Sequence, residues 1–170
     1  MDFFIEGGEP LAMSVEELQE FGLAEMTDDE IRRFLSTQKV GVLGLPGQDT
    51  PYLIPLSYGY DGEQRLYFTY LRGSSSRKAR LSDTADAASF LVYTIDTMYS
   101  WESVLLTGTL STVPESRWDE IEDTLADAWR PDLFRRASLE ATVTVYAYHI
   151  DERTGIKHQG LPPGFKFASE

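Results

Sequence analysis

The fold is decided by residues 39–71, KVGVLGLPGQDTPYLIPLSYGYDGEQRLYFTYL. Three runs of strand-forming residues alternate here with two turns, the polar run at 46–49 and the Asp61-Gly62 pair. An Asp-Gly pair between apolar runs is a strong signal of a tight β-hairpin. The stretch therefore predicts three consecutive antiparallel strands. We expect these strands at residues 39–45, 51–60 and 65–71.

After this stretch the strand pattern returns three more times. Residues 88–95, 103–113 and 141–150 are each rich in β-branched or aromatic residues. No G-x-G-x-x-G motif follows a strand, so the fingerprint of a doubly wound dinucleotide-binding fold is missing. The six runs predict an α+β protein built on an antiparallel barrel or strongly curled sheet, with helices at its flanks.

Three helices are expected around these strands. Thr27 and Glu30 have the spacing of a capping box, which predicts a helix over 28–37. Residues 77–81 suggest one or two helical turns. In residues 115–129, large apolar side chains recur at helical spacing, and we interpret this stripe as packing surface and not as a cofactor site. Its members are Trp118, Ile121, Leu125 and Trp129.

The chain of 170 residues is long enough for one domain with a substantial core. No internal repeat, low-complexity block or linker divides it. Residues 1–26 are expected to form an N-terminal arm with a short helix near 14–18, and residues 160–170 a tail. We therefore predict a single domain over residues 1–170.

Acidic residues outnumber basic ones. Asp and Glu number 28 against 15 Lys and Arg, which gives a formal net charge of −13. Nucleic acids are bound by clustered basic residues, so no nucleic-acid partner is expected. Most of the basic residues are arginines, and a lysine-poor acidic surface is typical of halophilic proteins, in which salt screens the repulsion. An ordinary acidic mesophilic protein is the alternative interpretation.

Other classes are disfavoured by what the sequence lacks. There is no cysteine, so disulfides and thiolate sites are excluded. The two histidines, His149 and His158, make a poor metal site, and we expect no metal. No apolar run reaches the roughly 18 residues of a membrane span, and the acidic start lacks the basic region of a secretory signal. We therefore expect a cytoplasmic protein without membrane contact.

Basic residues gather at one place, residues 71–80, LRGSSSRKAR. This run holds four of the 15 basic residues, together with a glycine and three serines, just before a predicted helix. Backbone N–H groups at a helix start, hydroxyls and an arginine are the parts of an anion-binding site. The alternative is a solvated loop whose arginines pair with nearby carboxylates.

Four motifs in order carry a resemblance to a known family. They are PLSYGYDG at 55–62, LYFT at 66–69, SRKA at 76–79 and WESVLLTG at 101–108. This series resembles the FMN-binding split barrels of the pyridoxamine 5′-phosphate oxidase-like family, and its last motif looks closest to the nitroimidazole-reductase-like branch. The resemblance covers about residues 39–113 and the capped helix before them. It implies an antiparallel split β-barrel of about six strands.

The resemblance also implies which residues hold the FMN phosphate. It assigns Thr69, Arg77 and Lys78 to the phosphate, with Ser76 contributing its hydroxyl or backbone. Arginine suits this role because its planar fork can bind a phosphate through two hydrogen bonds. The alternative for Thr69 is an ordinary strand residue.

A second group of residues would contact the flavin ring. The resemblance places Leu56 and Ser57 along the isoalloxazine edge, where backbone groups can bond the polar atoms of the ring. It brings Trp101 and Ser103 toward the ring from the fifth strand, with an interface between two copies as one arrangement. The alternatives are a strand residue for Ser57 and a loop anchor for Trp101.

The function implied is that of an FMN-dependent oxidoreductase in which the flavin carries the chemistry. Its substrate would be a small molecule or electron acceptor, NAD(P)H is one candidate electron donor, and a homodimer is expected. Two alternatives stay open, a non-catalytic flavin-binding or redox-sensing module and a barrel that binds deazaflavin or haem. Residues 160–167 lack the tryptophan and the Arg-x-x-Pro ending of the vitamin B6 oxidases, so that activity is not expected.

Overall fold

The computed structural model describes residues 19, 21–71, 76–126, 128 and 143–160. The predicted short helix near 14–18, the tail after residue 160 and Trp129 lie outside the described residues. All described strands form one antiparallel sheet of eight strands, in the order β3-β2-β6-β7-β8-β5-β4, with β1 beside β8. The strands are β1 (Leu23–Glu25), β2 (Val40–Leu45), β3 (Tyr52–Ser57), β4 (Gly59–Tyr60), β5 (Arg65–Leu71), β6 (Ala88–Thr97), β7 (Ser100–Val113) and β8 (Val143–Gln159).

The predicted α+β class with an antiparallel, strongly curled sheet is confirmed, and all six expected strands are present. The second expected strand divides at Tyr58 into β3 and β4, and the buried Tyr58 hydroxyl donates to the carbonyl of Leu35, 2.9 Å away. The tight turn at Asp61 is also confirmed. Its carboxylate accepts N–H groups of the next residues, among them that of Arg65 at 3.0 Å, and Gly62 has a φ of 86°.

Two strand predictions are wrong in extent. β8 does not end at residue 150 but runs to Gln159, and β1 lies within the expected N-terminal arm. The extension of β8 is rich in polar residues, which hides its strand pattern in the sequence. It is held by pairing along β7 and by two ion pairs to the helix above it, Arg153 to Asp28 and Lys157 to Glu30.

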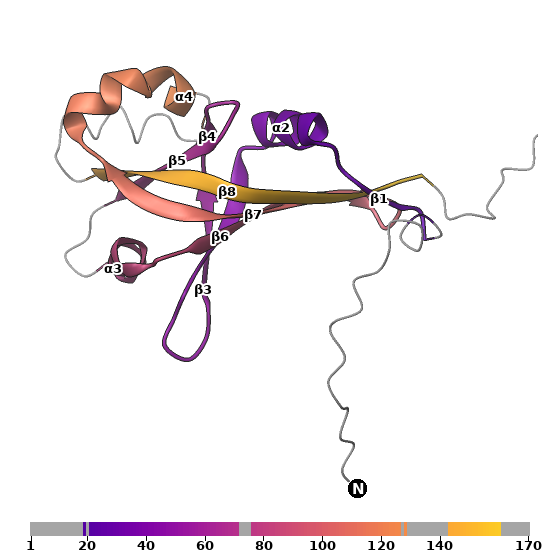
Figure 1. Ribbon diagram of the computed structural model, residues 1–170, viewed down its shortest axis with the longest axis horizontal. Coiled ribbons are helices and arrows are strands. Elements are labelled where there is room, and N and C mark those ends of the chain that lie inside the picture. Colours follow the sequence, from indigo (N-terminus) through magenta and orange to yellow (C-terminus); the bar gives the residue numbers. More distant parts are fainter. Residues whose placement is uncertain (1–18, 20, 72–75, 127, 129–142, 161–170) are drawn as a thin grey trace, which may run out of the picture.

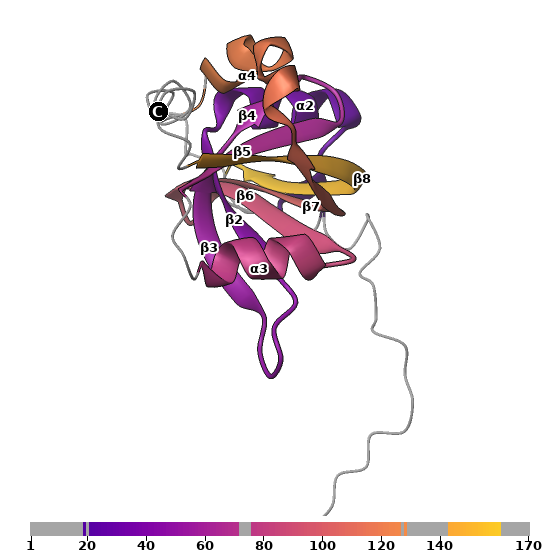
Figure 2. The same ribbon diagram turned by 90° about the vertical axis from the view of Figure 1, so that its left-hand side faces the viewer.

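The helices flank the sheet (Figure 1). α2 (Asp28–Thr37) has the predicted capping box, with the Glu30 N–H donating to the Thr27 hydroxyl at 3.3 Å and the Thr27 N–H to the Glu30 carboxylate at 2.9 Å. α3 (Arg77–Thr84) begins where it was expected and is longer. Figure 2 shows α3 on the side of the molecule opposite to α2 and α4 (Glu122–Ala126).

The continuous helix predicted for 115–129 is a correction. The chain instead forms a 3₁₀ helix, η1 (Glu115–Glu120), and then the short α4. In a 3₁₀ helix, side chains three residues apart lie above one another, so Trp118 and Ile121 both reach the sheet. The indole of Trp118 also donates to the carbonyl of Val113, 3.2 Å away, which ties η1 to the end of β7. The interpretation of the apolar stripe as packing is confirmed, because Trp118, Ile121 and Leu125 are buried.

The sheet has an inner and an outer face with different coverings. The inner face encloses the main core, which includes Phe68, Phe90 and Tyr148. The outer face of β5, β8 and the end of β7 packs on η1 and α4 through a smaller cluster around Trp118. The outer face of β3, β2, β6 and the first half of β7 carries exposed apolar side chains, including Tyr93 at 52 % exposure and Ile95 at 67 %. No helix among the described residues is long and apolar enough to cross a membrane.

Candidate flavin phosphate site

The start of α3 presents free backbone donors and two cations. Ser76 is the N-cap, and its hydroxyl accepts the N–H of Ala79 at 3.3 Å. The N–H groups of Arg77 and Lys78 donate to no acceptor in the described part of the chain. Helix starts of this kind attract anions, because their N–H groups point outward and the helix dipole is positive there.

The two cations lie over tyrosine rings that belong to different strands. The guanidinium of Arg77 is 5.0 Å from the ring centre of Tyr52 on β3, and the ammonium of Lys78 is 4.1 Å from that of Tyr70 on β5. β3 forms one end of the strand order and pairs with β2 alone among the described strands. The start of α3 therefore lies across the opening between β3 and β5, where no hydrogen-bonded ladder closes the barrel.

Arg77 and Lys78 are unusual because Lys78 is partly buried and neither side chain pairs with a described carboxylate. Burial lowers the pKa of Lys78 below its ordinary value, because desolvation disfavours the charged ammonium. Neither Lys78 nor Arg77 forms an ion pair with a described carboxylate, although the chain contains 28 acidic residues. Two cations at a helix start, neither of them paired with a described carboxylate, fit a dianionic phosphate, which would supply negative charge.

Tyr70, the tyrosine beneath Lys78, is fixed by a buried hydrogen bond. The hydroxyls of Tyr70 and Ser82 lie 3.0 Å apart, and burial raises the pKa of Tyr70 to about 12, so this phenol stays neutral. The ring of Tyr146 packs against Tyr70 with centroids 4.4 Å apart, and its hydroxyl donates to Asp83 of α3 at 2.6 Å. Sequence reasoning missed Tyr52 and Tyr70, although both occupy alternating positions of predicted strands and could have been placed on their inner faces.

The other predicted phosphate ligand, Thr69, lies differently. Side chains alternate along a strand, so Thr69 points to the outer face of β5 while Tyr70 points to the inner face. Its cross-strand neighbour Val145 belongs to the outer cluster. Within one chain, the Thr69 side chain and the Lys78 ammonium therefore approach β5 from opposite faces.

The residues predicted for the ring edge lie on β3. Leu56 packs its side chain against the main core and pairs along its backbone with Gly41 of β2, and Ser57 points to the outer face. Beside them a cavity of about 400 Å³ opens on the outer face. Its wall includes Pro55, Lys39 and Tyr93, none of which was assigned to the site from the sequence.

Trp101 and Ser103 lie far from α3 within one chain. Both are near the start of β7, and Trp101 stacks on His158 with ring centroids 6.3 Å apart. The strand that follows α3 begins at Ala88, which pairs with Gly108. Trp101 and Gly108 are seven residues apart on β7, a separation of about 23 Å along an extended strand. One copy of the chain thus holds Trp101 and Ser103 apart from the start of α3.

No three His, Asp or Glu side chains within the described residues gather closely enough to hold a metal ion.

The curled antiparallel sheet, opened between β3 and β5 and crossed there by a cationic helix start, defines the class of split β-barrels. The family model described as pyridoxamine 5′-phosphate oxidase matches residues 27–157, and the chain belongs to this family. Among proteins with curated functions, none matches the sequence significantly.

Solved structures with the same fold include proteins from three bacteria. An FAD-binding protein from Mesorhizobium loti has a TM-score of 0.66 and 19% identity, with 81% of this chain and 98% of that chain covered. The FAD and heme binding protein of Mycobacterium smegmatis has a TM-score of 0.66 and 18% identity, with coverages of 85% and 77%. A protein proposed to confer 5-nitroimidazole resistance in Bacteroides thetaiotaomicron has a TM-score of 0.59 and 15% identity, with coverages of 79% and 87%.

Proposed function

We propose that this protein is a flavin-dependent oxidoreductase that holds the phosphate of FMN at the start of α3. The observation that carries the proposal is the pair Arg77 and Lys78 at the opening of a split barrel, two cations of an acidic chain that form no ion pair with a carboxylate in the described ranges. Family membership and the naming of similar structures as FAD-binding proteins support a flavin as the ligand. When bound, the flavin supplies the electron transfer, and the chain binds and orients it.

Each residue at the site has a separate task. Arg77 grips two phosphate oxygens with its planar fork, and Lys78 adds a point charge that is strengthened by partial desolvation. The free N–H groups at the start of α3 bind a third oxygen. Ser76 keeps the helix start in shape through its bond with Ala79. The Thr69 hydroxyl can bind the FMN phosphate only if the phosphate reaches the outer face of β5.

Two copies of the chain complete the site in this proposal. The exposed apolar outer face around Tyr93 and Ile95 lies beside the cavity at Pro55, and it also bears Trp101 and Ser103. A second copy seated on this face would bury it and would bring its Trp101 to the flavin ring held by the first copy. A homodimer therefore accounts both for the apolar face and for the separation of Trp101 and Ser103 from the start of α3.

The first experiment identifies the ligand. Protein purified at high salt should be yellow, with the two absorption bands of an oxidised flavin, and heating should release FMN that chromatography and mass spectrometry identify. Release of FAD or of a deazaflavin would correct the ligand while keeping the site. A colourless protein that takes up no added FMN, or one with the Soret band of haem, would contradict the flavin proposal.

The second experiment tests the phosphate site. The double variant Arg77→Ala, Lys78→Ala should bind FMN at least a hundredfold more weakly, because each charge-assisted bond contributes roughly 1.5–3 kcal/mol. The exposed Arg33 on α2 provides a control, and Arg33→Ala should leave the affinity unchanged. Fluorescence quenching of FMN measures both. Equal affinities in the double variant and the control would place the phosphate elsewhere.

Turnover separates an enzyme from a flavin-binding or redox-sensing module. An oxidoreductase should oxidise NADPH or NADH steadily when a quinone or nitroaromatic acceptor is present, whereas a sensing module should be reduced once and then stop. The net charge of −13 and the small number of lysines favour a salt-rich cytoplasm as the place of action. These assays should therefore be run at high salt. The C-terminal residues favour a substrate other than pyridoxamine phosphate.

A further inference from the structure

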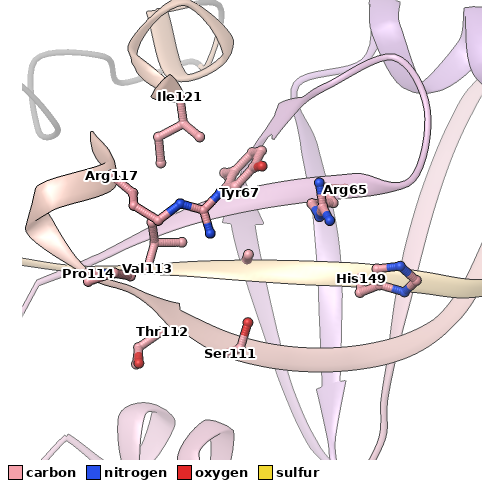
Figure 3. Close-up of a pocket in the computed structure, with 10 residues that line it drawn as sticks. Arg65, Tyr67, Ser111, Thr112, Val113, Pro114, Arg117, Ile121 and His149 are labelled. Atoms are coloured by element: carbon pink, nitrogen blue, oxygen red, sulfur yellow. The ribbon is translucent and has the colours of Figure 1, made fainter. Parts of the chain in front are cut away.

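A second cavity lies on the outer face, away from α3. It is a groove of about 220 Å³ between η1 and the strands β5, β7 and β8, and Figure 3 shows the side chains around it. Arg65 and His149 lie at one end of the groove, and the guanidinium of Arg117 reaches in from η1 at the other. The groove shares no lining residue with the start of α3 or with the cavity at Pro55.

One end of the groove carries a cross-strand pair of basic residues. Arg65 on β5 is the register partner of His149 on β8, so the two side chains are direct neighbours on the same face. Arg65 makes no ion pair with a described carboxylate. The imidazole Nδ1 of His149 lies 3.2 Å from the carboxylate of Asp151, which orients the ring and leaves Nε2 for another partner.

The other end of the groove holds an oriented arginine and two hydroxyls. The guanidinium of Arg117 binds Glu120 through Nε and an Nη at 3.0 and 2.9 Å, which fixes its direction. Tyr67 buries its ring while its hydroxyl bonds to no described residue, and Ser111 lines the same space from β7. These groups can donate hydrogen bonds to an anionic ligand.

The wall between the two ends is apolar. It consists of the Tyr67 ring, Ile121 and short side chains from β7, β8 and the β7-η1 junction, namely Val113, Pro114 and Ala147. A flat apolar group of about the size of one aromatic ring can pack on this wall. The groove therefore combines positive charge, hydroxyl donors and an apolar surface within a small volume.

We propose that this groove binds a small organic anion, with a carboxylate or phosphate group between Arg65 and His149 and a flat apolar group against Tyr67 and Ile121. Arg65, whose charge no described carboxylate pairs with, attracts the anion, and Arg117 with the hydroxyls of Tyr67 and Ser111 fixes the orientation. The flavin proposal involves other residues, so either proposal can fail without the other. Carboxylate and phosphate share the same recognition chemistry, and the experiment distinguishes them.

The experiment titrates the full-length protein with benzoate and with phenyl phosphate at constant ionic strength, using isothermal calorimetry. Benzyl alcohol, which has the ring without the charge, serves as the neutral control and should not bind measurably. Saturable binding of either anion is expected in the wild-type protein and also in the Arg77→Ala, Lys78→Ala variant, which lacks the proposed FMN phosphate site and therefore reports on the groove alone. The tighter of the two anions identifies carboxylate or phosphate as the preferred group.

Variants locate the binding site. Arg65→Gln should weaken binding of the preferred anion about tenfold or more, and Tyr67→Phe should weaken it by a smaller factor, while Arg33→Gln should have no effect. Arg65 is exposed near a hairpin, so its substitution leaves the core intact. Absence of binding of both anions, or equal affinity in Arg65→Gln and Arg33→Gln, would overturn the proposal.

Discussion

At the scale of single residues, the structure explains why Gly108, the last residue of the WESVLLTG motif, is a glycine. A Cβ atom added to Gly108 would lie 2.0 Å from the carbonyl oxygen of His149, closer than any side chain can approach. The register between β7 and β8 shifts at this point, and the bulge brings the two backbones together. The glycine thus belongs to the packing of two strands and not to flavin binding, although it is part of the motif that suggests the family.

Gly108→Ala should lower the free energy of unfolding by roughly 1–3 kcal/mol, because the backbone of β8 must move to admit the methyl group. Gly44→Ala serves as the control. There the nearest atom to an added Cβ is the end of the flexible Leu53 side chain at 3.3 Å. Denaturant titration measures both variants. Equal stability of the two would show that the bulge adapts without cost.

The tyrosines also differ in role: some have a structural role inside the barrel, and others lie at the candidate site. The hydroxyl of Tyr148 donates to the carbonyl of Ala88 at 2.9 Å, and that of Tyr58 to the carbonyl of Leu35. Burial raises the pKa of both phenols above the ordinary value. These residues satisfy backbone acceptors inside the barrel. Tyr52 and Tyr70 differ from them, because their rings face the two cations of the candidate site.

At the scale of elements, the attachment of α2 to β8 depends on ion pairs. Glu30 accepts the N–H of Thr27 within the capping box and also binds the ammonium of Lys157 on β8. The hydrogen bond from Lys157 and then that from Thr27 lower the pKa of Glu30 from 4.5 to about 2. A carboxyl group with a lowered pKa in the folded state stabilises the fold above its unfolded pKa. This contribution is lost as the pH falls from about 4.5 toward 2.

Glu30→Gln should therefore destabilise the protein at neutral pH, and the difference from the wild-type protein should shrink as the pH approaches 2. Glutamine can still serve in a capping box, so the variant isolates the charge that faces Lys157. Unfolding midpoints measured between pH 7 and pH 2 test this prediction. Glu63→Gln, at an exposed position in the hairpin before β5, should show no such pH dependence. A constant difference for Glu30→Gln would contradict the assigned role.

The elements also show what the sequence could and could not predict. Strands with apolar alternation and turns such as Asp61-Gly62 were predicted correctly, because local periodicity and turn chemistry specify them. The second half of β8 was missed, since its pairing with β7 and its ion pairs to α2 are contacts distant in sequence. The helix start at Arg77 was predicted from local charge. Its tyrosine partners come from two other strands, and no local pattern relates them to it.

At the scale of the whole molecule, the apolar outer face and the acidic net charge have opposite effects on the association of two copies. The apolar side chains around Tyr93 and Ile95 favour association of two copies, whereas each copy brings a net charge of −13. Electrostatic repulsion is screened within about 3 Å at 1 M salt, and apolar attraction is not weakened by salt. The proposed dimer should therefore be tighter at molar KCl than at low salt.

Light scattering coupled to gel filtration tests this dimer directly. The wild-type protein should have the mass of two chains at 2 M KCl, and dilution at low salt should favour the single chain. A double variant, Tyr93→Glu with Ile95→Glu, should be monomeric at both salt concentrations, because it adds buried like charges to the interface. Leu71→Glu, an equally exposed apolar position outside this face, should remain dimeric at 2 M KCl. If the double variant stays dimeric while FMN still binds, the second copy must sit on another surface, and the role given to Trp101 would have to be abandoned.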